Sequence, residues 1–453
     1  MQRVAEEFSR AVENWSRDYD VLHQSWLEAV QTCVKPQANA IRYQIKLLSE
    51  LTVIEALADR QYLPRYGFPI GLQKLRVIAP DEKDHSRVRE EDQYRLERSG
   101  MLAIGEYVPG SQLLAGGKLI TSRGLLKHWT GASLDSSPGL RGRLCHCENG
   151  HDYYWIAGHA DHCPICNGQP KRAPTDLLFV KYGFTSAAWD APKWGTGVER
   201  IGTAETLSVT FKPHSSEAGR IVERDFAGIR GLVADYREDG ELLVYNRGEH
   251  QLGFAICLKC GYAESEPESR GKGKMKLPRS LQGHAPITST RPWDVCWRDG
   301  DATPVLRNQV LAARETTDVL LLDFADCLGN EATEESLIIT LAYAFQRAAA
   351  RILELDSREL GVLLVPTGDG GKCRGAVIYD NVPGGAGHVR ELLIQGREWV
   401  KSARAALYVN EEHHRLCESA CLDCLLSFDA QRAMSQRPFM RRRALESLDR
   451  LLI

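Results

Sequence analysis

The sequence has no long apolar run: nothing in it approaches the ~18 consecutive apolar residues of a membrane-spanning helix. Its first residues, MQRVAEEFSRAVENW, are acidic and amphipathic and lack the apolar core of a signal peptide. We therefore expect a cytoplasmic protein. Positive charge is not in excess either, because the formal net charge is −3. Affinity for a polyanion can rest only on local basic patches.

The chain also lacks the motif G-x-x-x-x-G-K-[ST], whose backbone, lysine and hydroxyl hold the phosphates and Mg²⁺ of a nucleotide. The nearest segment is GGKLITS at 116–122, in which Leu119 follows the lysine. We therefore expect this chain to bind no nucleotide and to hydrolyse no ATP alone.

Cysteine, in contrast, is plentiful, with 13 residues that lie mostly in close pairs. In a long chain without a signal peptide, such pairs predict metal sites in a reducing compartment rather than disulfides. The strongest pattern is CHCENGHDYYWIAGHADHCPIC. Here Cys163 and Cys166 form a knuckle, and Cys145 and Cys147 lie upstream at the separation of a zinc ribbon's two hooks. Because one residue separates the upstream pair, His151 could replace Cys145 as a ligand.

A second set begins with Cys257 and Cys260, which a glycine follows. The turn after the second thiolate favours positive φ, which suits glycine. A tetrahedral zinc ion needs two more ligands, and His284 and Cys296 are the nearest downstream candidates.

A third set consists of Cys417, Cys421 and Cys424 in HHRLCESACLDCLLSF. We take His414 as its fourth ligand, and the alternatives are His413, Cys373 and Cys327. Thiolate-rich closed sites leave no open position for water, so these sites would be structural. We expect two to three Zn²⁺ ions in all.

Hydrophobic periodicity predicts a multidomain α+β fold. Apolar residues recur every three or four positions from Val4 to Val30 and again from Ile41 to Leu57, which predicts an antiparallel helical hairpin. Short apolar runs then indicate strands, and after Thr317 strands and helices alternate. The predicted division is a helical hairpin (1–62), a β-rich domain (63–144), a zinc ribbon (145–170), a β-rich domain (171–256), a second zinc-binding segment (257–300) and an α/β domain with a cysteine cluster (301–453).

A glycine turn lies in the segment IYDNVPGGAGHVRELL, between a strand that ends at Asp380 and a helix that begins near His388. Its glycines, Gly384, Gly385 and Gly387, could let the N–H groups at the helix start approach a nucleic-acid phosphate. An equally weighted alternative is a tight crossover that needs glycine only for packing. Asp380 and His388 as an acid–base pair is a third, weaker interpretation.

Two basic segments could add local affinity for nucleic acid: RGKGKMKLPR, with Lys272, Lys274 and Lys276, and MRRRALESLDR near the C-terminus. A solvated loop or helix face is the slightly more favoured interpretation of either segment alone.

The segment AVIYDNVPGGAGHVRELL, followed by LCESACLDCLLSFDAQ, resembles the MrfA-type zinc-binding domain. That domain lies at the C-terminus of large DEAD/DEAH-type helicases and occurs in phage-defence systems such as DISARM and Druantia. YLPRYGFPIGLQKLRVI, IGEYVPGSQLLAGGKLITSRGL, CLKCGYAE and TTDVLLLDF also resemble this family, so the likeness extends from about Gln44 to the C-terminus.

The resemblance implies a zinc-binding accessory subunit, or C-terminal region, of a superfamily 2 DNA helicase. The ATPase lobes of such helicases are absent here, so the motor would lie in another chain or another segment. Implied partners are that motor, DNA and other defence subunits, and the implied setting is bacterial phage defence or DNA repair. The alternative is a scaffold of a defence complex that never contacts nucleic acid. The family's metal site is expected to use four cysteines, whereas the third set offers three.

Overall fold

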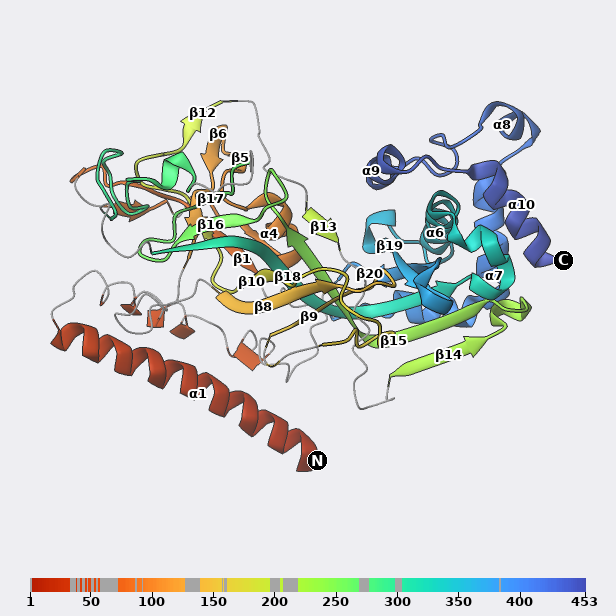
Figure 1. Ribbon diagram of the computed structural model, residues 1–453, viewed down its shortest axis with the longest axis horizontal. Helices are drawn as coiled ribbons and strands as arrows, with labels where there is room; N and C mark the ends of the chain where they lie inside the picture. The colour runs from red at the N-terminus through yellow and green to blue at the C-terminus, as the bar shows by residue number, and fades with distance from the viewer. Residues whose placement is uncertain are drawn as a thin grey trace.

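The computed structural model describes residues 2–32, scattered positions between 38 and 57, and the ranges 72–85, 88–91, 93–126, 139–156, 158, 161–195, 204–206, 219–268, 277–297, 304–382 and 384–453. The architecture is mixed α+β, with an N-terminal helix, a β-rich middle and C-terminal helices that include a cysteine cluster (Figure 1). The predicted fold class is therefore confirmed. Among the described residues, no helix is both long enough and apolar enough to cross a membrane.

The N-terminal helix α1 (Gln2–Gln31) lies along one side of the molecule (Figure 1). Its apolar stripe packs against the residues that follow it, because buried Leu22 and Ala29 share one cluster with Ala38 and Ile41. The described positions between 38 and 57 are helical, as the predicted hairpin requires. The remainder of the predicted second helix lies outside the described residues.

The middle of the chain forms short strands because its apolar runs are short and are broken by Gly, Pro and Asp. Three small sheets have the strand orders β4-β1-β11-β7, β12-β6-β5 and β2-β3. One short helix, α4 (Gly100–Glu106), begins after Ser99, whose hydroxyl accepts the N–H of Leu102. The strands are β1 (Gln73–Arg76), β2 (Ile78–Pro80), β3 (Val88–Glu90), β4 (Glu97–Arg98), β5 (Gln112–Ala115), β6 (Lys118–Thr121), β7 (Gly124–Leu125), β11 (Phe184–Thr185) and β12 (Lys193–Trp194).

An 11-stranded sheet links the middle of the chain to its C-terminal part, with the main order β13-β15-β18-β10-β8-β9. Its longest strand, β18 (Val305–Asp323), pairs with β10 and β16 through its first half and with β20 through its second half. Strands from several of the predicted domains thus belong to one sheet. The domain boundaries given by the sequence analysis remain a prediction. The other strands are β8 (Gly139–His146), β9 (Asp152–Trp155), β10 (Thr175–Val180), β13 (Ala204–Thr206), β14 (Arg220–Arg224), β15 (Val233–Asn246), β16 (Phe254–Cys257) and β17 (Ala263–Ser265).

The C-terminal part alternates strands and helices as predicted, but β19 (Leu360–Thr367) and β20 (Cys373–Asp380) pair antiparallel with each other, and β20 pairs antiparallel with β18. Helices cover this end of the sheet (Figure 1). The indole of fully buried Trp399 donates to the carbonyl of Phe345 at 2.9 Å, which fixes α7 on α6. The helices are α5 (Ala325–Leu328), α6 (Glu335–Ile352), α7 (His388–Leu407), α8 (Glu411–Leu416), α9 (Phe428–Gln436) and α10 (Arg441–Leu452).

Candidate metal centres

The first centre lies where the β8–β9 hairpin meets the downstream knuckle. A backbone bridge between Cys147 and Pro170 holds the two segments together. As a result, Cys147, His151, Cys163 and Cys166 place their ligand atoms within 4.8 Å of one another. These are two thiols of the knuckle, one thiol of the hairpin turn and one imidazole, which is a donor set that zinc accepts.

Distances and hydrogen bonds at this centre fit a tetrahedral ion. The Sγ atoms of Cys147 and Cys166 are 3.8 Å apart. Zinc with Zn–S bonds of about 2.3 Å places neighbouring sulfurs about 3.8 Å apart, whereas disulfide sulfurs are about 2 Å apart. The backbone N–H of His151 donates to Cys147 Sγ, and the amide of Asn149 donates to Cys166 Sγ, both at 3.3 Å. Such donors stabilise thiolate charge.

Cys145 does not join this group. It is buried, and its Sγ lies 3.9 Å from the carbonyl oxygen of Arg172. The structure thus assembles the alternative in which His151 takes the place of Cys145. The reason is the strand geometry. Side chains of a regular strand alternate between its two faces, so residues 145 and 147 would share a face if β8 continued. Strand β8 ends at His146, however, and Cys147 lies at the start of the turn, so the two thiols point to different places.

The protonation of these thiols depends on their burial. Burial raises the pKa of Cys147 and raises that of Cys163 to about 12. Burial also acts on Cys166, but hydrogen bonds from Asn149 and the Gly168 backbone lower the pKa of its thiol on balance. Because zinc binds thiolates, metal binding would displace protons that the buried thiols otherwise keep.

The second centre brings together all four residues that spacing suggested: Cys257, Cys260, His284 and Cys296. Cys257 ends β16, and Gly261 after the knuckle has φ 87°, the positive value that the turn requires. The Sγ atoms of Cys257 and Cys296 are 3.9 Å apart, and Cys260 Sγ lies 3.2 Å from His284 Nε2.

His284 has the environment of a metal ligand. Its Nδ1 lies 2.9 Å from the carbonyl oxygen of Leu281, to which it can donate a hydrogen bond. That bond fixes the tautomer in which Nε2 carries the free lone pair, and this lone pair faces the thiols.

The third centre uses His413 rather than His414. Helix α8 begins after Asn410, whose side chain accepts the N–H of His413. The His413 imidazole comes together with the sulfurs of Cys417, Cys421 and Cys424. Cys424 Sγ is 3.8 Å from Cys417 Sγ and 3.7 Å from Cys421 Sγ, which again are the separations of a tetrahedral zinc shell.

Two further observations support a metal at the third centre. Both ring nitrogens of His413 are buried without a hydrogen-bond partner among the described residues, which is costly unless a ligand satisfies one of them. The alternative ligands Cys327 and Cys373 lie in α5 and at the start of β20, outside the group. Metal binding at each of the three centres nevertheless stays a prediction.

A buried arginine binds the backbone carbonyls next to the ligands of the third centre. Arg441 has no exposed surface, and its guanidinium donates to the carbonyls of Cys417, Leu407 and His414 at 2.9, 2.6 and 3.2 Å. These carbonyls lie at the C-terminal ends of α7 and α8, where the helix dipole favours positive charge. A zinc ion with three thiolates and a neutral imidazole has a net charge of −1, so Arg441 also complements the loaded site.

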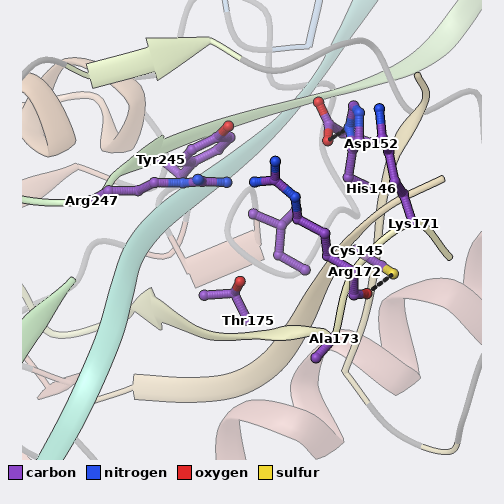
Figure 2. A pocket seen from close by; sticks show the side chains of 10 residues that line it. Cys145, His146, Asp152, Lys171, Arg172, Ala173, Thr175, Tyr245 and Arg247 are labelled. Atoms are coloured by element: carbon purple, nitrogen blue, oxygen red, sulfur yellow. Dashed lines mark hydrogen bonds and ion pairs between the residues drawn. The ribbon is translucent and has the colours of Figure 1, made fainter. Parts of the chain in front are cut away.

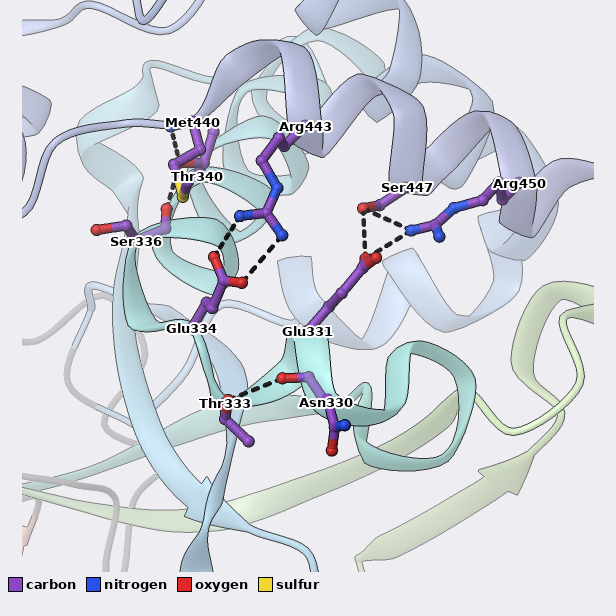
Figure 3. Close-up of polar contacts among 10 residues, drawn as sticks. All are labelled: Asn330, Glu331, Thr333, Glu334, Ser336, Thr340, Met440, Arg443, Ser447 and Arg450. Carbon is purple, nitrogen blue, oxygen red and sulfur yellow. Dashed lines mark hydrogen bonds and ion pairs between the residues drawn. The ribbon is translucent and has the colours of Figure 1, made fainter.

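Two other arginines of the C-terminal basic segment are already paired with carboxylates, whereas exposed Arg442 donates to the backbone carbonyls of His414 and Arg415. Arg443 pairs with Glu334 through both guanidinium nitrogens, one of them at 3.0 Å, and Arg450 pairs with Glu331 at 2.5 Å (Figure 3). These pairs join α10 to the start of α6. The other predicted basic residues, Lys272, Lys274 and Lys276, lie outside the described residues.

The glycine turn differs from the phosphate site that it resembles, because carboxylates already occupy its N–H groups. Asp380 accepts hydrogen bonds from the backbones of Ala386, His388 and Val389 at 2.7, 3.1 and 3.1 Å. Asp318 accepts the N–H of Gly387 at 3.1 Å. The expectation that free N–H groups at this helix start await a phosphate is therefore wrong.

The glycines instead permit close packing. A Cβ on Gly385 would lie 2.5 Å from the carboxyl carbon of Asp318, and Gly384, Gly385 and Gly387 all have positive φ. Asp380 organises the turn, so the structure gives no support to an acid–base pair with His388, whose Nε2 is 3.7 Å from Glu359. Contact of Gly384, Gly385, Gly387 or His388 with nucleic acid by another surface stays untested.

Comparison with known proteins bears on the third centre. Residues 341–425 match the family model of the MrfA Zn-binding domain. The match contains all four residues of the third centre and confirms the resemblance seen in the sequence for this segment. No curated protein matches the chain.

Two solved structures are similar at low level. One is the DUF1998 helicase MrfA bound to DNA, with 13% identity and a TM-score of 0.34, and the other is MrfA bound to DNA and AMPPNP, with 11% identity and a TM-score of 0.30. Both alignments cover 83% of this chain but only 34% and 31% of the MrfA chains, so the chain spans about one third of their length. Scores this low do not establish a common fold.

Sequence reasoning missed the supporting residues. Asn149 lies between two predicted ligands, and its position in that turn was the only available signal. Nothing in the run of three arginines at 441–443 indicates that Arg441 is the buried one.

Proposed function

We propose that this chain is a zinc-bearing accessory region of a superfamily 2 DNA helicase, which guides DNA for an ATPase motor in another chain or another segment. One observation carries the proposal. The segment that matches the MrfA Zn-binding domain contains a complete group of one histidine and three cysteines, so the chain has both the family's sequence pattern and a donor set for its metal.

The proposed role is to guide DNA, without hydrolysis of ATP by this chain. The GGK segment that most resembles a nucleotide loop is the tight turn of the β5–β6 hairpin. Its Lys118 extends over the ring of Trp194, with Nζ 5.5 Å from the ring centre. A nucleotide loop instead needs its lysine at the start of a helix, beside the β- and γ-phosphates.

The proposed setting is the bacterial cytoplasm, in phage defence or DNA repair. Centres built from reduced thiols suit a reducing compartment. The proposed partners are the motor and DNA, together with other subunits of the defence system.

The test combines two measurements on the zinc-loaded chain. Fluorescence anisotropy with labelled DNA should show binding that weakens as salt rises, because phosphate contacts release counterions. Affinity capture from the native host, read by mass spectrometry, should recover a superfamily 2 ATPase. Capture of the motor without DNA binding at low salt would contradict the proposal and favour a scaffold.

A further inference from the structure

A pocket of about 330 Å³ lies beside the first metal centre and belongs to none of the three centres (Figure 2). Its walls come from the end of β8, the segment after the knuckle, the start of β10 and the end of β15. Sheet order explains the convergence, because β15 and β10 flank β18 and β8 follows β10. The charged side chains of the lining are mostly basic: Lys171, Arg172 and Arg247, against Asp152.

No carboxylate in the described part of the chain neutralises these three cations. Among the described residues, none of them forms an ion pair with a carboxylate, whereas the acidic side chain in the lining, Asp152, lies 2.8 Å from His146 Nδ1 and pairs with that imidazole. The Nε of Arg247 is buried and has no hydrogen-bond partner in the described part of the chain. A buried guanidinium nitrogen without an acceptor is costly, and an anionic ligand would satisfy it.

Printed contacts position the guanidinium of Arg247 and the backbone of Lys171 and Arg172. The Arg247 guanidinium stacks on the ring of Tyr245, 5.1 Å from its centre, which leaves the N–H edges of the guanidinium free. The backbone N–H of Lys171 donates to the carbonyl of His146 at 2.8 Å, and the Arg172 carbonyl accepts the Cys145 thiol at 3.9 Å. Figure 2 shows the guanidinium groups of Arg172 and Arg247 pointing toward each other. Two like charges that converge without a partner favour an anion between them.

We propose that this pocket holds a phosphate group of the DNA backbone, with Arg172 and Arg247 as the gripping pair and Lys171 as an additional positive charge. This inference rests on the proposed function and names the chemical group that the chain would hold. The planar fork of arginine matches phosphate oxygens in a bidentate manner. The volume exceeds that of a phosphate alone, so the neighbouring sugar of the strand can enter with it.

The test compares three zinc-loaded proteins in DNA anisotropy titrations across a salt series: wild type, Arg247→Gln and Arg224→Gln. Arg224 is an exposed arginine of β14 that makes no ion pair within the described residues, so its variant matches the loss of charge. Arg247→Gln should weaken binding about tenfold and reduce the slope of log K against log salt by about one, because one phosphate contact is lost. Arg224→Gln should leave both unchanged.

Arg172→Gln provides a second variant on an exposed side chain, in case Arg247→Gln alters folding, which zinc content and melting would reveal. Equal affinity and slope for wild type and a folded Arg172→Gln or Arg247→Gln, with DNA binding otherwise intact, would overturn this inference alone. Failure of the wild type to bind DNA at any salt concentration would overturn the proposed function as well.

Inorganic phosphate separates the two sources of the ligand. The wild-type pocket should bind inorganic phosphate weakly. Arg172→Gln and Arg247→Gln should lose affinity for both inorganic phosphate and DNA. If inorganic phosphate stabilises only the wild type while all variants bind DNA equally, the pocket takes a free anion and not the DNA backbone, and the proposal is wrong.

Discussion

The arginines of α10 and the cations beside the first metal centre differ in whether their charge is already used. Arg443 and Arg450 pair with glutamates that precede α6, and Arg441 is buried against three carbonyls. Arg172 and Arg247 lie 75 residues apart in the sequence, face one pocket and have no carboxylate partner in the described part of the chain. Three arginines of the dense basic run thus contribute to folding, whereas the two arginines of the pocket come from distant positions and keep their charge unneutralised within the described residues.

The largest expected effect concerns the first metal centre. Cys163→Ser should remove one zinc ion and destabilise the region by roughly 5 kcal/mol or more, because the binding energy of a structural zinc is folding energy. Cys145→Ser, a change to the neighbouring thiol outside the group, should keep its zinc and its melting temperature nearly unchanged.

Zinc analysis and thermal melting of both variants check this expectation. Loss of zinc from Cys145→Ser with retention in Cys163→Ser would reverse the ligand assignment. In that case Cys145, which lines the pocket, would be a zinc ligand, and the pocket would no longer be separate from the first metal centre.

The next effect tests how the basic segment is used. Arg441→Met should cost about 3 kcal/mol, because buried carbonyls lose their donors. Arg450→Gln should cost less than about 1 kcal/mol, because an exposed ion pair contributes little. Denaturant unfolding monitored for the C-terminal helices gives both values. Equal costs would show that burial does not distinguish the two arginines.

How far the sequence predicts this site depends on local spacing. The pairs Cys163/Cys166 and Cys257/Cys260 are close in the chain, and their knuckles form as spacing indicates. The choice between Cys145 and His151, or between His413 and His414, depends on which way a side chain faces, and adjacent residues do not reveal this. The pocket cations were not predictable at all, because only the order of β15, β18, β10 and β8 brings them together.

The fold shows the same limit. Helical periodicity predicted α1, and the predicted alternation of strands and helices after Thr317 is present. Alternation does not fix pairing, however, and the β19–β20 hairpin with its turn at Asp369–Gly371 makes the C-terminal strands antiparallel.

The pH-dependent effect concerns the two carboxylates of the glycine turn. Burial, and then the charge of Asp380, raise the pKa of Asp318 to about 6. A raised carboxyl pKa favours the folded state below the unfolded value, near 4, and this contribution is lost as pH rises through about 6. Asp318→Asn should therefore match wild type near pH 4 and exceed its stability at pH 8, by up to the roughly 3 kcal/mol that a shift of about two pKa units represents.

Melting curves of Asp318→Asn and wild type from pH 4 to 8 measure this difference. A difference that stays constant with pH would show that Asp318 keeps its ordinary pKa in the folded chain. In that case neither burial nor the charge of Asp380 would destabilise the ionised form of Asp318.

The most direct test of the account is the number of zinc ions in the intact chain, counted by native mass spectrometry for wild type, His413→Ala and His414→Ala. Three complete groups predict three ions in the wild type, two in His413→Ala and three in His414→Ala. A wild type with one ion or none, or a His413→Ala protein that keeps every ion while His414→Ala loses one, would contradict it.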